Sequence, residues 1–186
     1  MYLRYSGFMF EEGDTLQQPA AGQKAGSVWK VIVAVVILLA AGLGGGMLVA
    51  HDVLDGRITI PKSITQNAAM PVVVPRKLPG TYKIAGTSFN LKEKVVVFEA
   101  SDGTGGKINF TEQQKPAGFN FDNFYAQQLQ DPTTLNDVPF SSVVGQLTGT
   151  KTKMLSVVTD KTWVIATTTA PLSTDDMQII AQSIKK

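Results

Sequence analysis

The stretch Val95–Glu112, VVVFEASDGTGGKINFTE, decides how the second half of this chain folds. Val95–Ala100 is rich in β-branched and aromatic residues, which is typical of a strand. The run SDGTGG that follows has the residue types of a tight turn. Lys107–Glu112 then alternates inward-facing Ile108 and Phe110 with polar residues, so it predicts the returning strand of a hairpin.

Charged residues accompany this hairpin. Glu93, Glu99 and Glu112 fall on or beside its strands among several lysines. Pairs of opposite charge across neighbouring strands are common on the solvent-facing side of a sheet. We therefore expect these carboxylates to decorate a wet face rather than to perform acid–base chemistry. The glycine-rich turn joins two strands and precedes no helix, so we expect a hairpin turn there and no phosphate site.

Further strands and a short helix are expected around the hairpin. Phe119–Leu129 breaks the strand-like alternation and predicts a short amphipathic helix whose aromatic side packs on the sheet. Trp163 is either a core anchor or an exposed ligand platform, and its apolar neighbours Val164 and Ile165 favour the core. The remaining strands are expected at Tyr82–Ala85, Ser88–Leu91, Val143–Leu147, Met154–Val158 and Thr162–Thr169.

The chain ends in an amphipathic helix. Ser173 fits its N-cap, and Asp175 and Asp176 lie in its first turn, where negative charge meets the positive end of the helix dipole. Those helix-start roles explain the adjacent carboxylates better than catalysis does. The sequence therefore predicts an α+β fold: an antiparallel sheet with a short middle helix and a C-terminal amphipathic helix packed on it. The apolar stripe of that helix is Met177, Ile180, Ala181 and Ile184.

Composition excludes several kinds of chemistry. The chain has no cysteine and one histidine, His51, so disulfides, cysteine-ligated zinc, iron–sulfur clusters and a His-based triad in the folded domain are excluded. A net charge of +2, with no stripe of Lys and Arg, argues against nucleic-acid binding. We expect no catalytic residues, no cofactor and no metal, hence no enzyme. An envelope hydrolase is the weakest alternative.

An uncharged run precedes the domain. Val31–Ala50, VIVAVVILLAAGLGGGMLVA, is twenty residues long, and a helix of that length spans about 30 Å, the thickness of a bilayer's hydrocarbon core. The run is longer than the apolar region of a signal peptide, and Leu48–Ala50 fits the cleavage pattern poorly. We predict an uncleaved transmembrane helix within residues 28–50. Lys30 directly before the run favours a cytoplasmic N-terminus and an extracytoplasmic domain.

The predicted transmembrane helix contains a possible contact between two copies of the chain. Gly42 and Gly46 form a GxxxG pattern, which lets two membrane helices approach closely. Because small residues are common in membrane helices, a chance match is the alternative. The pattern gives the hypothesis of a homodimer with Gly42 and Gly46 in its helix–helix contact.

The remaining segments complete the predicted domain organisation. Residues 1–27 are expected to be a disordered cytoplasmic tail, whose aromatic start is alternatively a short partner-binding motif. Residues 51–70 are expected to be a Pro-containing linker, because proline prevents a continuous helix. The chain becomes strand-like at Val72–Val74, and residues 71–186 are expected to form the extracytoplasmic α+β domain.

The order of these elements is also similar to that of a known domain family. LPGTYKI, the VVVFEA–turn–KINFTE hairpin, TWVIATTT and LSTDDMQIIAQSI together resemble a bacterial extracytoplasmic domain family of unknown function. That family occurs in single-span membrane proteins, including some anti-sigma-factor-like and sporulation-associated ones. The resemblance covers about Pro71 to Ile184 and implies an extracytoplasmic, non-enzymatic module without assigned functional residues. The tail of this chain is too short for a folded sigma-binding domain, which argues against that role.

Two functions from different classes follow from these observations. The first is a membrane-anchored extracytoplasmic binding or sensing module, non-enzymatic, whose partner is an envelope protein. The alternative is a structural or assembly protein of the envelope that associates with itself through its transmembrane helix. In both, the chain is an integral protein of the cell membrane.

Overall fold

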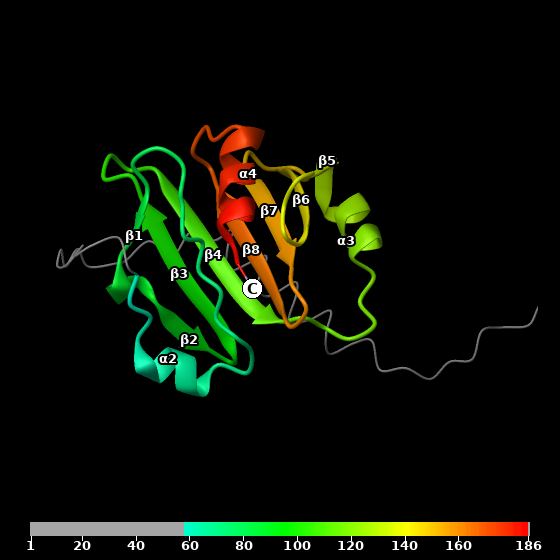
Figure 1. Cartoon of the computed structure of the whole chain (residues 1–186). Helices are drawn as coiled ribbons and strands as arrows, with labels where there is room; N and C mark the ends of the chain where they lie inside the picture. The colour runs from blue at the N-terminus through cyan, green and yellow to red at the C-terminus, as the bar shows by residue number, and fades with distance from the viewer. Residues whose placement is uncertain (1–57, 186) are drawn as a thin grey trace, which may run out of the picture.

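Eight strands form one antiparallel sheet in the part of the chain that the structure, a computed structural model, describes: residues 58–185 (Figure 1). Across the sheet the order is β1-β3-β4-β8-β7-β6-β5, and β2 also pairs with β3. The strands are β1 (Lys83–Ile84), β2 (Asn90–Lys92), β3 (Val95–Ser101), β4 (Lys107–Gln114), β5 (Leu129–Thr134), β6 (Ser141–Leu147), β7 (Lys153–Val158) and β8 (Thr162–Thr168). The helices are α2 (Lys62–Asn67), the 3-10 turn η1 (Gly86–Ser88), α3 (Phe121–Gln128) and α4 (Thr174–Ser183).

The predicted hairpin is confirmed and lies at the centre of one half of the sheet. β3 and β4 pair antiparallel with Phe98 opposite Phe110, and the two rings stack with centroids 4.7 Å apart. After β4 the chain passes through α3 to β5 at the far edge, and β6, β7 and β8 return by successive antiparallel pairings. β8 then pairs with β4, with Ala166 opposite Phe110, so this pair joins the two halves into one sheet.

Helix α4 covers one face of the sheet (Figure 1). All residues of its predicted apolar stripe have 0% exposure, and they pack in one cluster with Phe98 and Phe110. The Ser173 hydroxyl accepts a hydrogen bond from the Asp176 backbone, and the Asp176 carboxylate accepts one from the Ser173 backbone. The predicted N-cap and the amphipathic helix are therefore both confirmed.

Helix α3 lies near β5 (Figure 1) and packs on the opposite face. Its Phe124 and Tyr125 form a second cluster with Trp163 and Ile165. Asn120 caps the helix, because its side-chain oxygen accepts a hydrogen bond from the backbone of the third helical residue. The aromatic side of this helix faces the sheet, as predicted.

The chain before β1 is built into the domain. Residues 62–67, expected within a linker, form α2, and Pro61 precedes its first turn, where a missing N–H costs nothing. Ile64 and Met70 are buried in the cluster under α4, so apolar burial organises this segment. Val72–Val74, expected to be strand-like, packs against the same cluster but lies outside the sheet.

Strand β5 was not predicted from the sequence. Its residues, LQDPTT, are polar apart from Leu129 and Pro132, and every residue after Leu129 is exposed. The pairing with β6 shifts register between Gln130 and Thr133, and Asp131 has a positive φ of 51°. A bulge and Pro132 in an edge strand both remove the alternation by which strands are recognised.

The described domain is thus an antiparallel sheet with a few helices, an α+β arrangement. The transmembrane helix predicted within residues 28–50 lies outside the described residues. Between residues 58 and 185 no helix has the length and apolar character needed to cross a bilayer.

Candidate functional site

The buried carboxyl group of Glu112 is the most unusual polar feature of the domain. Strand β4 places Glu112 between Val96 on β3 and Val164 on β8, and all three residues are at most 1% exposed. Because side chains alternate along a strand, Glu112 shares the α4-covered face with Ile108 and Phe110. Acidic side chains are almost never fully buried unless they are paired.

The hydrogen-bond partner of Glu112 lies on the segment that precedes β1. Its Oε2 accepts a hydrogen bond of 3.0 Å from the Val73 backbone N–H. Its Oε1 has no hydrogen-bond partner in the described part of the chain. Nearby on β8, the Thr162 hydroxyl donates a 2.8 Å hydrogen bond to the Pro71 carbonyl. Two side chains of the sheet therefore hold Pro71 and Val73, and one of them is titratable.

Burial determines the protonation of Glu112. Removal of the carboxyl from water raises the pKa of Glu112 to about 8, and the Val73 N–H lowers it only in part. At neutral pH the folded chain therefore holds Glu112 mainly as the uncharged acid. Such a group stores a proton that ordinary surface carboxyls have already released.

The prediction that Glu112 lies on a wet face is wrong. Residues i, i+2 and i+4 of a strand point to the same side, so the alternation that buries Ile108 and Phe110 also buries Glu112. The prediction rested on the charge of Glu112, whereas the alternation of the strand was the sequence signal that indicated its burial. The same interpretation holds for Glu93, which is exposed, and Glu99, which is half-buried.

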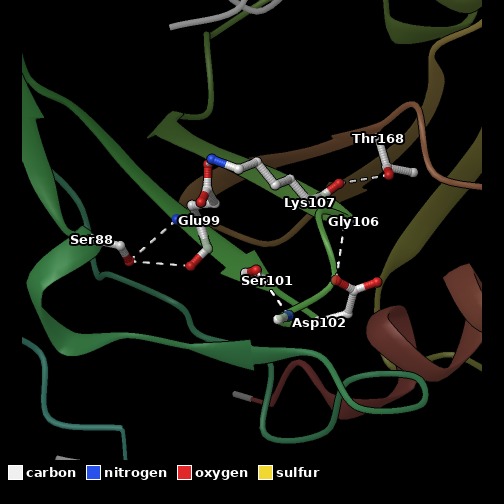
Figure 2. A network of polar contacts seen from close by, with 8 residues as sticks. Ser88, Glu99, Ser101, Asp102, Gly106, Lys107 and Thr168 are labelled. Carbon is white, nitrogen blue, oxygen red and sulfur yellow. Dashed lines mark hydrogen bonds and ion pairs between the residues drawn. The ribbon is translucent and has the colours of Figure 1, made fainter. Parts of the chain in front are cut away.

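Polar contacts near the β3–β4 turn hold this end of the hairpin to its neighbours (Figure 2). The Ser88 hydroxyl donates to the Glu99 carbonyl at 3.2 Å and accepts from the Glu99 N–H at 3.3 Å. Lys107 Nζ lies 3.1 Å from Glu99 Oε2, an ion pair between neighbouring strands of the general kind expected for this face. The Thr168 hydroxyl donates to the Lys107 carbonyl at 2.7 Å. These contacts link strands to one another, and we assign them a structural role.

Asp102 closes the turn between β3 and β4 (Figure 2). Its Oδ1 accepts hydrogen bonds from the backbone N–H groups of Thr104 at 2.7 Å and Gly106 at 2.9 Å. The Thr104 N–H is the main cause that lowers the pKa of Asp102. A Cβ atom at Gly106 would overlap the Asp102 carboxylate and the Tyr82 hydroxyl, so a larger residue there would displace these two side chains. The segment is a hairpin turn, as predicted.

Trp163 belongs to the core, as predicted, with 0% exposure. Its indole N–H donates a 2.8 Å hydrogen bond to the Ser156 hydroxyl. The same hydroxyl lies 2.8 Å from the Tyr125 hydroxyl, so Ser156 satisfies two buried aromatic polar groups at once. Phe119 and Phe121 pack around the indole ring, with ring centroids 5.5 and 5.2 Å from it.

The other residues singled out in the sequence separate into two groups. Asp176 completes the capping box of α4, and Asp175 is exposed in the first turn, so both have the expected helix-start positions. Gly42 and Gly46 lie outside the described residues. Within residues 58–185, no three His, Cys, Asp or Glu side chains are grouped to hold a metal ion.

Comparison with known proteins adds no relative. No family model, no curated protein and no solved structure matches the chain. The site is therefore interpreted from its own geometry.

Proposed function

We propose that this protein is a membrane-anchored extracytoplasmic binding or sensing module without enzymatic activity. In this proposal Val31–Ala50 spans the membrane, the N-terminus is cytoplasmic and an envelope protein is the partner. The observation that supports it most is that few residues separate the folded domain from the apolar run in the sequence. Ile58 already packs against the core of the domain, eight residues after Ala50.

That short connection limits where the domain sits. Eight residues reach at most about 30 Å when fully extended, so an anchor ending at Ala50 keeps the domain within about one bilayer thickness of the membrane surface. A module in that place meets partners in or near the membrane. The resemblance to extracytoplasmic domains of single-span proteins agrees with this placement.

The sheet edges bear on how a partner is bound. At one edge, β5 contains Pro132 and a register shift. At the other, β1 and β2 have two and three residues and share the single neighbour β3. Short, bulged and proline-containing edges resist the addition of a further strand. We therefore expect the partner to contact side-chain surfaces of the domain rather than to extend its sheet.

The topology is tested with single cysteines, because the chain has none of its own. Thr104 is exposed at the tip of the β3–β4 turn, and Thr15 lies in the N-terminal tail. In intact cells, a membrane-impermeant maleimide should label Thr104→Cys and should label Thr15→Cys only after the cells are opened. Labelling of Thr15→Cys alone in intact cells would refute the proposed orientation.

The partner is tested by photo-crosslinking from exposed positions of the domain in intact membranes. A defined complex with a different envelope protein supports a binding module. Complexes of the chain with itself alone favour the assembly function and oppose the binding function. Gly42→Leu with Gly46→Leu should abolish such self-crosslinks if the predicted helix contact makes them. Gly44→Leu, two residues off that face, is the matched control.

A further inference from the structure

The entry segment, residues 71–77, passes over the sheet and is held to three different elements. Glu112 on β4 and Thr162 on β8 bind Val73 and Pro71, as described above. At its other end, the Arg76 N–H donates to the Ser183 carbonyl at 3.3 Å. The Ser183 hydroxyl shares its one proton between the Lys77 carbonyl at 2.9 Å and the Ile180 carbonyl at 2.8 Å. Since this segment forms no strand, these hydrogen bonds and its apolar contacts hold it in place.

Among the four hydrogen bonds to this segment, only the one to Glu112 involves a group that titrates. The uncharged acid accepts the Val73 N–H and leaves one oxygen, Oε1, without a partner. The ionised form places a full charge on a carboxylate that has one donor and no contact with water. A buried carboxylate is stable only with several donors or a counter-charge. The Val73 N–H binds the carboxylate more strongly than the acid, but this one donor offsets the cost of burial only in part. On balance, ionisation therefore favours a movement that lets water reach Oε1.

The entry segment is the part of the enclosure best able to move. Glu112 is flanked on its own sheet by Val96 and Val164, which belong to strands paired on both of their sides. The entry segment, which covers Glu112, has no hydrogen-bonded strand pairing of this kind, and its residues Val72–Val74 are half-buried. Local openings start where few backbone hydrogen bonds resist them. Water is therefore expected to reach the carboxyl from the side of Val73.

We propose that Glu112 is a proton-controlled latch: its neutral form keeps residues 71–75 on the sheet, and loss of its proton releases them. The latch is a property of the domain alone. Its consequence, a change in how the domain is held relative to the membrane, rests on the proposed anchoring by Val31–Ala50.

No other charged group of the described domain competes for this role. Arg76 and Lys77 on the entry segment are exposed, and Glu99 on β3 points to the opposite face, where it pairs with Lys107. β8 has no titratable residue, and the acidic residues of α4 lie in its first turn, whereas the segment meets its last residue. The charged side chains on the surrounding elements and just after α4 are Arg76, Lys77, Lys92, Glu99, Lys107, Asp175, Asp176 and Lys185; of these, Lys92 and Lys185 are also exposed.

The test follows the backbone amide of Val73 by NMR in the full-length, ¹⁵N-labelled chain in detergent micelles. Hydrogen exchange is converted to a protection factor, which removes the intrinsic effect of pH on exchange. From pH 6 upward we expect the Val73 protection factor to fall by up to about tenfold per pH unit, and to level off above the pKa of about 8. The Leu155 amide, in a central strand, should keep its protection over the same range.

Two neutral variants identify the titrating group. Glu112→Gln keeps a carbonyl for the Val73 N–H but cannot ionise, so its Val73 protection should not change with pH. Glu99→Gln removes a carboxylate from the neighbouring strand and should retain the wild-type response. A flat Val73 profile in the wild-type chain overturns the latch without any variant, as does an unchanged response in Glu112→Gln. Because the readout is made in micelles, neither result depends on the topology or partner of the anchored protein.

Discussion

Glu112 should make this domain lose stability as the pH rises. The pKa of its carboxyl increases from 4.5 to about 8 on folding, so between these values the folded chain binds a proton that the unfolded chain has released. The free energy of unfolding therefore falls as pH rises. The stabilisation is complete below about pH 4.5, is lost as the pH passes through about 8, and stays absent above it. At about 1.4 kcal/mol per pH unit, the loss amounts to about 5 kcal/mol.

The measurement is equilibrium unfolding by urea of the full-length chain in micelles, at several pH values. The chain has two tryptophans, so a Trp29→Phe background leaves Trp163 as the single reporter. Trp163 is fully buried in the cluster under α3, and its emission should shift to longer wavelength when the domain unfolds. Its cluster lies on the face opposite Glu112, so the reporter is not itself changed by the titration.

Glu112→Gln separates this effect from other titrations. The wild-type acid already has an unpartnered O–H at Oε1, and the amide nitrogen in its place adds one further unpartnered N–H, which costs about 1–3 kcal/mol at every pH. The variant should therefore be less stable than wild type at pH 5 and more stable at pH 9.5, with a much flatter profile between them. Glu99→Gln should follow the wild-type profile. If Glu112→Gln retains the full decrease with pH, or if wild type does not lose stability above pH 6, the reasoning is refuted.

Three further substitutions test the packing with the same assay. Ser156→Ala leaves the Trp163 indole N–H and the Tyr125 hydroxyl without their shared partner, and should cost about 1–3 kcal/mol for each group left unpaired. Ile180→Ala opens a cavity under α4 and should cost about 2–5 kcal/mol. Ser173→Ala removes the N-cap and should cost about 1 kcal/mol. A Ser173→Ala effect larger than that of Ile180→Ala would contradict the assigned burial.

Elements with local signals were predictable from the sequence. The hairpin of β3 and β4 follows from alternation and a glycine-rich turn, and α4 follows from its cap and apolar stripe. The core position of Trp163 follows from its neighbours. Each of these signals lies within about ten to twenty residues of sequence, so no distant contact was needed to recognise them.

The elements that the sequence missed depend on distant partners. β5 exists because β6 offers it an edge, and α2 exists because Ile64 finds an apolar cluster built by strands far along the chain. Glu112 is different, since its alternation with Ile108 and Phe110 was a local sign of burial, although its charge led to the wrong prediction of a wet face. The Val73 N–H that accompanies this burial lies 39 residues away, and nothing near Glu112 in the sequence indicates it.

The pairing of β8 with β4 also affects how the chain can be made. β4 ends at Gln114 and its neighbour β8 begins at Thr162, so the hairpin has an open edge until almost the whole chain has emerged. Contacts of such sequence separation slow folding. During synthesis the edges of β4 and β7 therefore stay unpaired until β8 is available, and any truncation before Thr162 should leave both of these edges free to aggregate.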